Sequence, residues 1–269
     1  MFPIQEWCCG GCRAKTFGND LSMLRALLLL FVMISSLRAG EGVILLHGLC
    51  RTNRSMDRME AAFAAAGFTV VNVDYPSRVS AVEPLGEKVI GRALEDPRLR
   101  GCERVHFVAH SLGGILVRSY FARRSEPRLG RVVMLGPPNQ GSEVVDRLGS
   151  WSLFRRINGP AGSQLGTDAA SVPNSLGAVR FDLGVIAGDR TINWINSLMI
   201  AGRDDGKVSI DRTKVEGMKE HIVVHVSHPF LMKDRGVVAA ALRFVESGSF
   251  SSRKSTPEDC APRPATIHP

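Results

Sequence analysis

From residue 43 onward, short apolar runs alternate with longer segments whose apolar residues recur at helical spacing. The runs are rich in β-branched residues and apolar on both faces, which is typical of buried parallel strands. Strands that alternate with helices indicate βα units joined into one parallel sheet. We therefore expect six strands, over residues 43–46, 69–74, 104–109, 131–135, 183–187 and 221–226.

The remaining segments define the expected domain. Between and after the strands, the spacing predicts helices over residues 54–66, 82–94, 112–124 and 230–246. Residues 142–181 are rich in Gly, Ser, Asn and Pro, so we expect a short cap-like insertion there. Residues 247–269 lack hydrophobic periodicity and are predicted to be a disordered tail. One domain at residues 40–246 remains, and it is long enough to bury a sizeable core.

Residues 1–39 are predicted to be an N-terminal extension that ends in a segment resembling a secretory signal. Arg25 precedes an unbroken apolar stretch at residues 26–34, and the small residues within 35–39, which end at Ala39, could present a cleavage site. The stretch is shorter than the roughly 18 apolar residues that a membrane span needs. A buried core helix is the alternative interpretation. We expect export to the periplasm or the medium, or attachment to a membrane if the segment is not cleaved.

Charge and cysteine content narrow the range of partners. The net charge of +8 suits an anionic membrane or lipid surface. The basic residues are not clustered and aromatic residues make up only 6%, so nucleic-acid binding is not expected. The three cysteines of the extension lack a second Cys or His pair with which to ligate a metal. Cleavage near residue 39 would leave at most one disulfide among Cys50, Cys102 and Cys260.

The strongest chemical signal lies at residues 105–114, where an apolar strand runs directly into a helix. Ser111 occupies the turn, with the small residues Ala109 and Gly113 two positions before and after it. This is the pattern of a nucleophile elbow with Ala in place of the first Gly. An N-cap serine is the alternative, but the strand immediately before it favours a nucleophile. The helix N-terminus would point its amides at an oxyanion formed beside Ser111.

A second strand end supplies candidate oxyanion donors. The strand at residues 43–46 is followed by His47, Gly48 and Leu49, and Gly48 allows the backbone to turn toward the site. Acyl transfer needs about two aligned N–H groups where negative charge develops. We expect these to be the backbone amides of Leu49 and Leu112. His47 is an alternative base, although its position at a strand end suits loop structure better.

A serine nucleophile needs a base. His228 is the predicted base, because it follows the last strand and precedes Pro229 and the last helix, at the carboxyl edge of the sheet. His221 and His225 lie at the start of that strand and within it, where they would face core or solvent.

The base in turn needs an acid that orients it. Asp205 is the predicted acid, since it lies on an Asp-Gly turn in the loop after the fifth strand. Asp204 and Asp189 remain alternatives, because turn-forming aspartates are common.

Together these motifs resemble small lipases and esterases of the α/β-hydrolase superfamily, including the lipase-like relatives of GPI inositol-deacylases. The matching segments are residues 47–49, 109–114, 135–142, 204–206 and 227–228. The resemblance implies an α/β fold with a minimal, mostly parallel sheet of about six strands and helices on both faces. It also implies that Ser111, Asp205 and His228 form a catalytic triad, and that residues 135–142 help to line the site.

We expect a serine hydrolase that cleaves carboxylic esters, including lipid esters, through an acyl-serine intermediate, with no metal or organic cofactor. Pro137, Trp151 and Phe154, with Leu153 and Pro138, are predicted to form an apolar substrate pocket, and simple packing is the alternative. An acyltransferase would use the same triad with an alcohol acceptor. A non-catalytic α/β-hydrolase-like binding protein is the second alternative.

Overall fold

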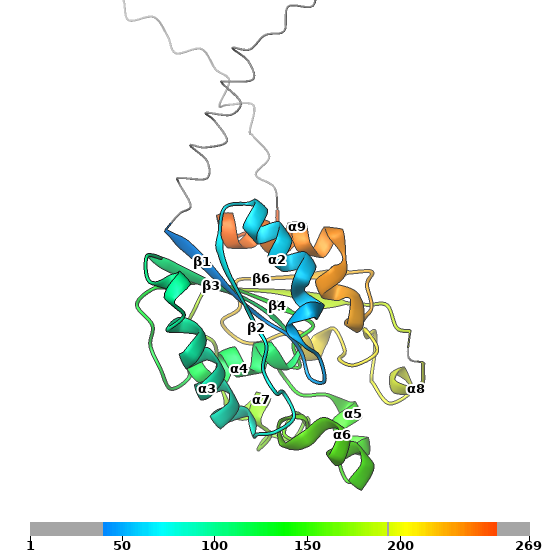
Figure 1. The fold of residues 1–269 in the computed structure, drawn as a ribbon. Helices are drawn as coiled ribbons and strands as arrows, with labels where there is room; N and C mark the ends of the chain where they lie inside the picture. Colours follow the sequence, from blue (N-terminus) through cyan, green and yellow to red (C-terminus); the bar gives the residue numbers. More distant parts are fainter. Residues whose placement is uncertain (1–39, 193, 252–269) are drawn as a thin grey trace, which may run out of the picture. The chain divides into compact units, whose positions relative to one another are not determined.

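Six strands form one sheet in which every neighbouring pair runs parallel, in the order β2-β1-β3-β4-β5-β6 (Figure 1). The computed structural model describes residues 40–192 and 194–251, so the predicted extension and signal-like segment at residues 1–39 lie outside it. The prediction of six strands is confirmed. Their bounds are Glu41–Leu46 (β1), Thr69–Val73 (β2), Arg104–His110 (β3), Leu129–Leu135 (β4), Leu183–Gly188 (β5) and Glu220–Val224 (β6).

Alternate residues of each central strand pack into two separate cores. In β1, Val43 and Leu45 face the helices α2 (Asp57–Ala65) and α9 (Arg235–Ser247). Ile44 and Leu46 face α3 (Val82–Leu94) and α4 (Leu112–Phe121). This follows from the two-residue period of a strand, which directs successive side chains to opposite faces. The sheet therefore has helices on both faces, as predicted (Figure 1).

The helices on these faces begin and end close to the predicted positions. The helix α2 follows a 3-10 turn at Asn53–Met56, and α4 ends three residues earlier than expected. The last predicted helix is divided at Asp234, whose side chain caps α9 by accepting a hydrogen bond from the Val237 amide. The bounds are Asp57–Ala65 (α2), Val82–Leu94 (α3), Leu112–Phe121 (α4) and Arg235–Ser247 (α9), with 3-10 turns at Pro97–Leu99, Asp211–Thr213 and His228–Lys233.

The insertion between β4 and β5 is more helical than its composition predicts. Gly159, with φ of +68°, produces a kink before Pro160 within α6 (Ser152–Ser163) and lies against the backbone of Arg78.

Among the described residues, no helix is both long and apolar enough to cross a bilayer. The helices of this region are α5 (Glu143–Leu148), α6 (Ser152–Ser163) and α7 (Val172–Ser175), and α8 (Trp194–Ser197) follows β5.

The expected tail begins later than predicted. Gly248, with φ of +76°, ends α9, and Phe250 is buried against Phe244 with ring centroids 4.8 Å apart. The apolar ring of Phe250 therefore extends the packed domain beyond residue 246. The predicted tail from residue 252 to 269 lies outside the described residues.

The buried imidazole of His106 gives the stability of this fold a pH dependence. His106 lies within β3, where its Nδ1 accepts a hydrogen bond from the Arg131 amide (2.9 Å). Burial, together with the positive charges of Arg131 and Arg104, lowers the pKa of His106 to about 4. As the pH falls below about 6.5, the unfolded chain binds a proton at this position and the folded chain does not, so unfolding becomes more favourable.

We expect the His106→Gln variant to show a weaker loss of stability in acid. Between pH 6.5 and 4.5 its free energy of unfolding should fall less steeply than that of the wild type, by up to about 1.4 kcal/mol per pH unit. Above pH 7 the two slopes should coincide, because His106 is neutral in both states. Urea unfolding at several pH values measures the slopes, and equal slopes in acid would contradict the linkage.

Candidate active site

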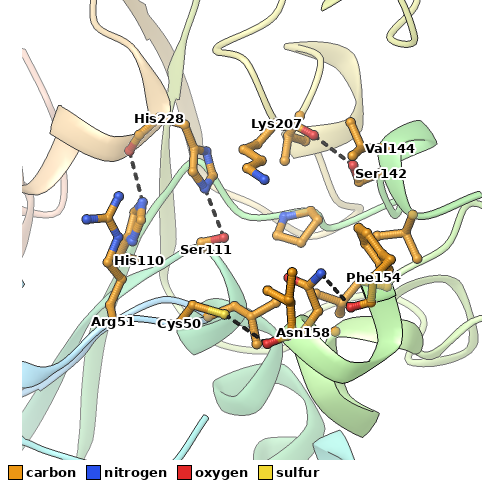
Figure 2. A pocket seen from close by; sticks show the side chains of 17 residues that line it. Cys50, Arg51, His110, Ser111, Ser142, Val144, Phe154, Asn158, Lys207 and His228 are labelled. Atoms are coloured by element: carbon orange, nitrogen blue, oxygen red, sulfur yellow. Dashed lines mark hydrogen bonds between the residues drawn. The ribbon is translucent and has the colours of Figure 1, made fainter. Parts of the chain in front are cut away.

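Ser111 lies in the turn between β3 and α4, as the sequence predicts (Figure 2). Its backbone has φ of +53° and ψ of −119°, a region that non-glycine residues rarely occupy. The Ser111 amide donates to the Leu135 carbonyl of the neighbouring strand (2.9 Å), and its own carbonyl accepts from the Gly114 amide (2.9 Å). These bonds hold the hydroxyl at the carboxyl edge of the sheet.

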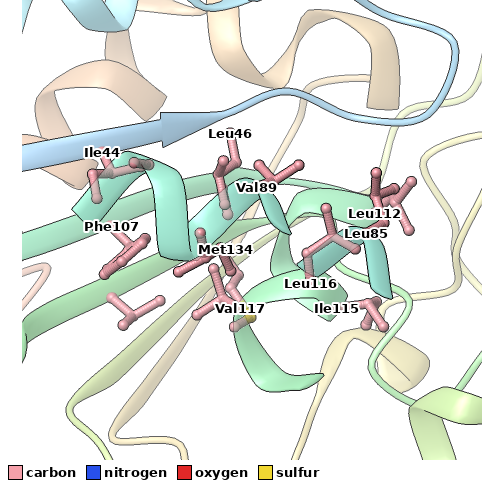
Figure 3. Close-up of a cluster of buried hydrophobic side chains, with 14 of the residues drawn as sticks. Ile44, Leu46, Leu85, Val89, Phe107, Leu112, Ile115, Leu116, Val117 and Met134 are labelled. Carbon is pink, nitrogen blue, oxygen red and sulfur yellow. The ribbon is translucent and has the colours of Figure 1, made fainter. Parts of the chain in front are cut away.

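The packing of α4 explains why small residues surround Ser111. A Cβ at Gly113 would lie 2.9 Å from the carbonyl oxygens of both Leu46 and His47, which is too close for any side chain. Further along α4, Ile115 and Leu116 are fully buried in the core below the sheet (Figure 3). The helix is therefore seated tightly on β1, and the turn that carries Ser111 has little freedom to relax.

The three residues of the predicted triad come together in the structure. Ser111 Oγ lies 3.0 Å from His228 Nε2, and His228 Nδ1 lies 2.7 Å from Asp205 Oδ2. The carboxylate fixes the tautomer, because Nδ1–H donates to it and leaves Nε2 free to accept the Ser111 proton. The His228 amide also donates to the Asp205 carbonyl (2.9 Å), so the two loops are joined through the backbone as well.

The alternative acids are engaged elsewhere. Asp204 Oδ1 accepts from the hydroxyl of Ser197 (2.6 Å) and the amide of Gly206 (2.7 Å), which stabilises the turn. Asp189 forms ion pairs with Arg203 and His225. Of the three aspartates that the sequence offered, only Asp205 is within hydrogen-bond distance of His228.

The alternative histidines also have structural partners. His221 is hydrogen-bonded to the hydroxyl of Thr213 (2.8 Å). His47 stacks on Tyr75 with ring centroids 4.0 Å apart, and its Nδ1 donates to the Gly48 carbonyl (2.8 Å). Burial lowers the pKa of His47, which is consistent with a neutral ring that shapes the loop.

The two predicted oxyanion donors lie in segments that border Ser111. Leu112 is the first residue of α4, so its amide is one of those that the helix leaves without an intrahelical partner. Leu49 lines the same cavity as Ser111. The loop of Leu49 is close to the nucleophile, because a Cβ at Gly48 would lie 3.2 Å from the Ser111 Cβ.

A cavity of about 350 Å³ opens beside Ser111 and His228. The insertion supplies most of its apolar wall, to which α6 contributes Phe154 (Figure 2). Ile157 of the same helix also lines the cavity. Phe154 therefore lies where the sequence analysis placed it. The remaining apolar lining residues are Leu49, Pro138, Val144, Val145, Leu165 and Val208.

Two predicted pocket residues lie elsewhere. Pro137 is buried beneath the site, where a Cβ at Gly114 would lie 3.3 Å from its Cβ. Trp151 is 62% exposed and does not line the cavity. It precedes the first turn of α6 with extended backbone angles, so it does not share the face that carries Phe154. Leu153, which was grouped with them, is also exposed and outside the cavity.

Sequence reasoning also missed three polar residues at the site. His110 Nε2 donates to the His228 carbonyl (3.1 Å), and burial lowers the pKa of His110 well below its usual value. Arg51 and Lys207 line the cavity. The sequence offers only their positions as a clue to a role in the site. His110 directly precedes Ser111, and Lys207 follows Asp205 by two residues.

The comparisons with known proteins agree with this architecture. A family model described as "Alpha/beta hydrolase family" matches residues 43–241. A comparison with curated proteins finds no match. Similar solved structures include the mature lipase BlEst2 of Bacillus licheniformis, at 16% identity and a TM-score of 0.58 over 72% of this chain and 87% of that one.

Two further structures share the fold over less of their own length. The metagenomic carboxyl esterase MGS0156 has 17% identity and a TM-score of 0.53, over 71% of this chain and 65% of that one. The phospholipase PlaB of Legionella pneumophila has 20% identity and a TM-score of 0.52, over 65% of this chain and 44% of that one. At these identities the likeness shows the fold.

The geometry around Gly136 leads to a test of the Asp205–His228 hydrogen bond. Gly136 has φ of +54°, and a Cβ there would lie 3.0 Å from both Asp205 Oδ2 and His228 Nδ1. We expect Gly136→Ala to push these groups apart and to weaken the far-downfield proton NMR signal of His228 Nδ1–H.

The matched control is Gly177→Ala. Gly177 has a similar φ of +66°, but nothing lies within 4 Å of an added Cβ. Both variants should lose about 1 kcal/mol of stability from backbone strain, whereas only Gly136→Ala should change the His228 signal. An unchanged signal in a folded Gly136→Ala protein would contradict the geometry.

Proposed function

The chain belongs to the alpha/beta hydrolase family, and we propose that it is a serine esterase or lipase that cleaves carboxylic esters through an acyl-serine intermediate. The observation that carries this proposal is the continuous hydrogen-bonded series from Ser111 through His228 to Asp205, at the mouth of a largely apolar cavity. A hydroxyl acquires nucleophilic character when a correctly oriented base can take its proton.

The reaction has two halves. In the first, Ser111 Oγ attacks the ester carbonyl carbon while its proton passes to His228 Nε2, and the same proton then goes to the departing alcohol as the ester C–O bond breaks. In the second, His228 takes a proton from water, the water attacks the acyl-serine, and the proton returns to Ser111 Oγ as the acid leaves. Asp205 stabilises the imidazolium formed in each half.

The negative charge of each tetrahedral intermediate needs donors beside Ser111. The amides of Leu49 and Leu112 are the groups that we assign to this role, since both residues lie in segments against the serine. Leu112 has the further advantage of the positive end of the α4 dipole.

The cavity favours an ester with an apolar acyl chain. Its volume of about 350 Å³ and the wall around Phe154 and Ile157 would remove such a chain from water. That a lipase and a carboxyl esterase share the fold is consistent with this substrate class. The exposed Trp151 and Leu153 at the start of α6 support contact with a lipid surface near the site.

Replacement of the nucleophile tests the proposal directly. We expect Ser111→Ala to reduce the hydrolysis of 4-nitrophenyl butyrate by at least about 1,000-fold and to abolish labelling by a fluorophosphonate probe. The control is Ser175→Ala, since Ser175 is exposed at the end of α7 and outside the cavity. Wild-type turnover by Ser111→Ala would refute the serine mechanism.

The identity of the acid is tested by amide substitution. We expect Asp205→Asn to lower kcat by roughly 1,000-fold or more, because the amide can no longer hold the Nδ1–H tautomer of His228. Asp189→Asn serves as the matched control and should lower kcat less than about threefold, since Asp189 pairs with His225 and Arg203 and does not contact the triad. Equal losses in the two variants would contradict the assignment.

A further inference from the structure

In the part of the chain that the structure describes, two basic residues and no acidic residue line the cavity beside Ser111. Arg51 and Lys207 are its charged lining residues when the histidines are neutral, and no Asp or Glu is among the described residues that line it. Within that described part of the chain, neither cation has a carboxylate oxygen within 4 Å of its side-chain nitrogens. A cation that points into a substrate cavity without an acidic partner is available to bind an anion.

The backbone of Lys207 is fixed by the turn that carries the catalytic acid. Its amide donates to Asp205 Oδ1 (3.0 Å), and its carbonyl accepts from the Ser142 hydroxyl (2.7 Å). Figure 2 shows the side chain extending from this turn into the space beside His228. The ammonium group is therefore delivered to the site by the same structure that orients the base.

The environment of Lys207 leaves its charge incompletely compensated. Burial is the largest influence and lowers the pKa of Lys207, the positive charge of Arg51 lowers it further, and Cys50 and Asp205 act in the opposite direction. The oxygens of Asp205 are already occupied, by His228 on one side and by backbone amides on the other. Lys207 is nevertheless an exposed residue, so an anion in the cavity would replace water at its ammonium group.

Arg51 lies on the other side of the nucleophile. Figure 2 shows it beside His110, with Ser111 and His228 between it and Lys207. Its charge contributes to the lowered pKa of His110, so it acts on the site electrostatically. The two cations thus border the reactive serine from separate loops.

The opposite wall of the cavity has a different chemistry. It is formed by the insertion and is mainly apolar, with Val144, Phe154 and Ile157 among its residues and Ser142 and Asn158 as polar members. A ligand that satisfies both walls has an apolar chain at one end and an anionic group near the ester at the other.

We propose that this enzyme acts on esters whose alcohol portion carries a phosphate or carboxylate, which Lys207 binds while the acyl chain lies against the insertion and Arg51 adds positive charge from the other side of Ser111. This inference rests on the proposed serine esterase activity and narrows its substrate class. Both anions present oxygen acceptors to the ammonium donor of Lys207.

The test compares three butyrate esters with similar phenol leaving groups: 4-butyryloxybenzamide, 4-butyryloxybenzoate and 4-butyryloxyphenyl phosphate. The first is neutral, and the other two separate carboxylate from phosphate recognition. We expect the wild type to have a kcat/KM at least tenfold higher for one or both anionic esters than for the benzamide. A wild type without that preference would overturn the proposal, and this result requires no variant to fold.

Variants then assign the preference to the two cations. Lys207→Met should lower the ratio of anionic to neutral kcat/KM by about tenfold or more, Arg51→Met should lower it by a smaller factor, and Lys207→Arg, which keeps the charge, should retain most of it. The control is Lys214→Met, since Lys214 pairs with Asp211 outside the cavity. A ratio that is unchanged in Lys207→Met would refute the site.

The same measurements separate this inference from the proposed function. Efficient hydrolysis of the benzamide ester with no anionic preference would remove the anion site and leave the esterase intact. Failure to hydrolyse any of the three esters, together with no fluorophosphonate labelling of Ser111, would remove both.

Discussion

The buried carboxylate of Asp205 is the interaction on which the site depends. It is fully buried, and a charge in that position is tolerated only when its oxygens are hydrogen-bonded. Oδ2 accepts from His228, whereas Oδ1 accepts from the amides of Lys207 and Val208. One side chain therefore orients the base, shapes its own turn and sets the starting point of the Lys207 side chain. The imidazole of His228 and the side of the cavity that carries Lys207 are thus joined by hydrogen bonds to one carboxylate.

The sheet and the elbow could be predicted because their signals are local. The hydrophobic periods of strands and helices can be recognised within short stretches of sequence. The small residue Gly113 near Ser111 is required by the close approach of α4 to β1. The choice of Asp205 over Asp189 depends on which carboxylate lies within hydrogen-bond distance of His228. That distance depends on how separate loops fold together, so no single stretch of sequence predicts it. The insertion lacks a clear hydrophobic period, so the sequence does not show which face of α6 lines the cavity. The prediction that Trp151 lines it is wrong, because Trp151 precedes the first turn of α6 with an extended backbone.

The site combines two sources of structure with different tolerances. Ser111 and His228 follow β3 and β6 of the parallel sheet, Asp205 lies in the loop after β5, and hydrogen bonds join the three side chains. The cavity wall comes from short helices of the insertion, joined by glycines such as Gly159 that occupy positive φ. The catalytic groups and the apolar part of the cavity thus come from separate parts of the chain, whereas Lys207 comes from the turn that carries the acid.

The backbone of Ser111 has a consequence for how such a protein can evolve or be engineered. Its positive φ costs folding free energy that a glycine would not pay. Selection for heat resistance alone would therefore favour glycine at residue 111, which has no hydroxyl, and a library selected only for thermostability would accumulate inactive proteins. Substitutions that raise stability without lowering turnover are therefore expected in the two hydrophobic cores that pack on either side of the sheet, away from Ser111.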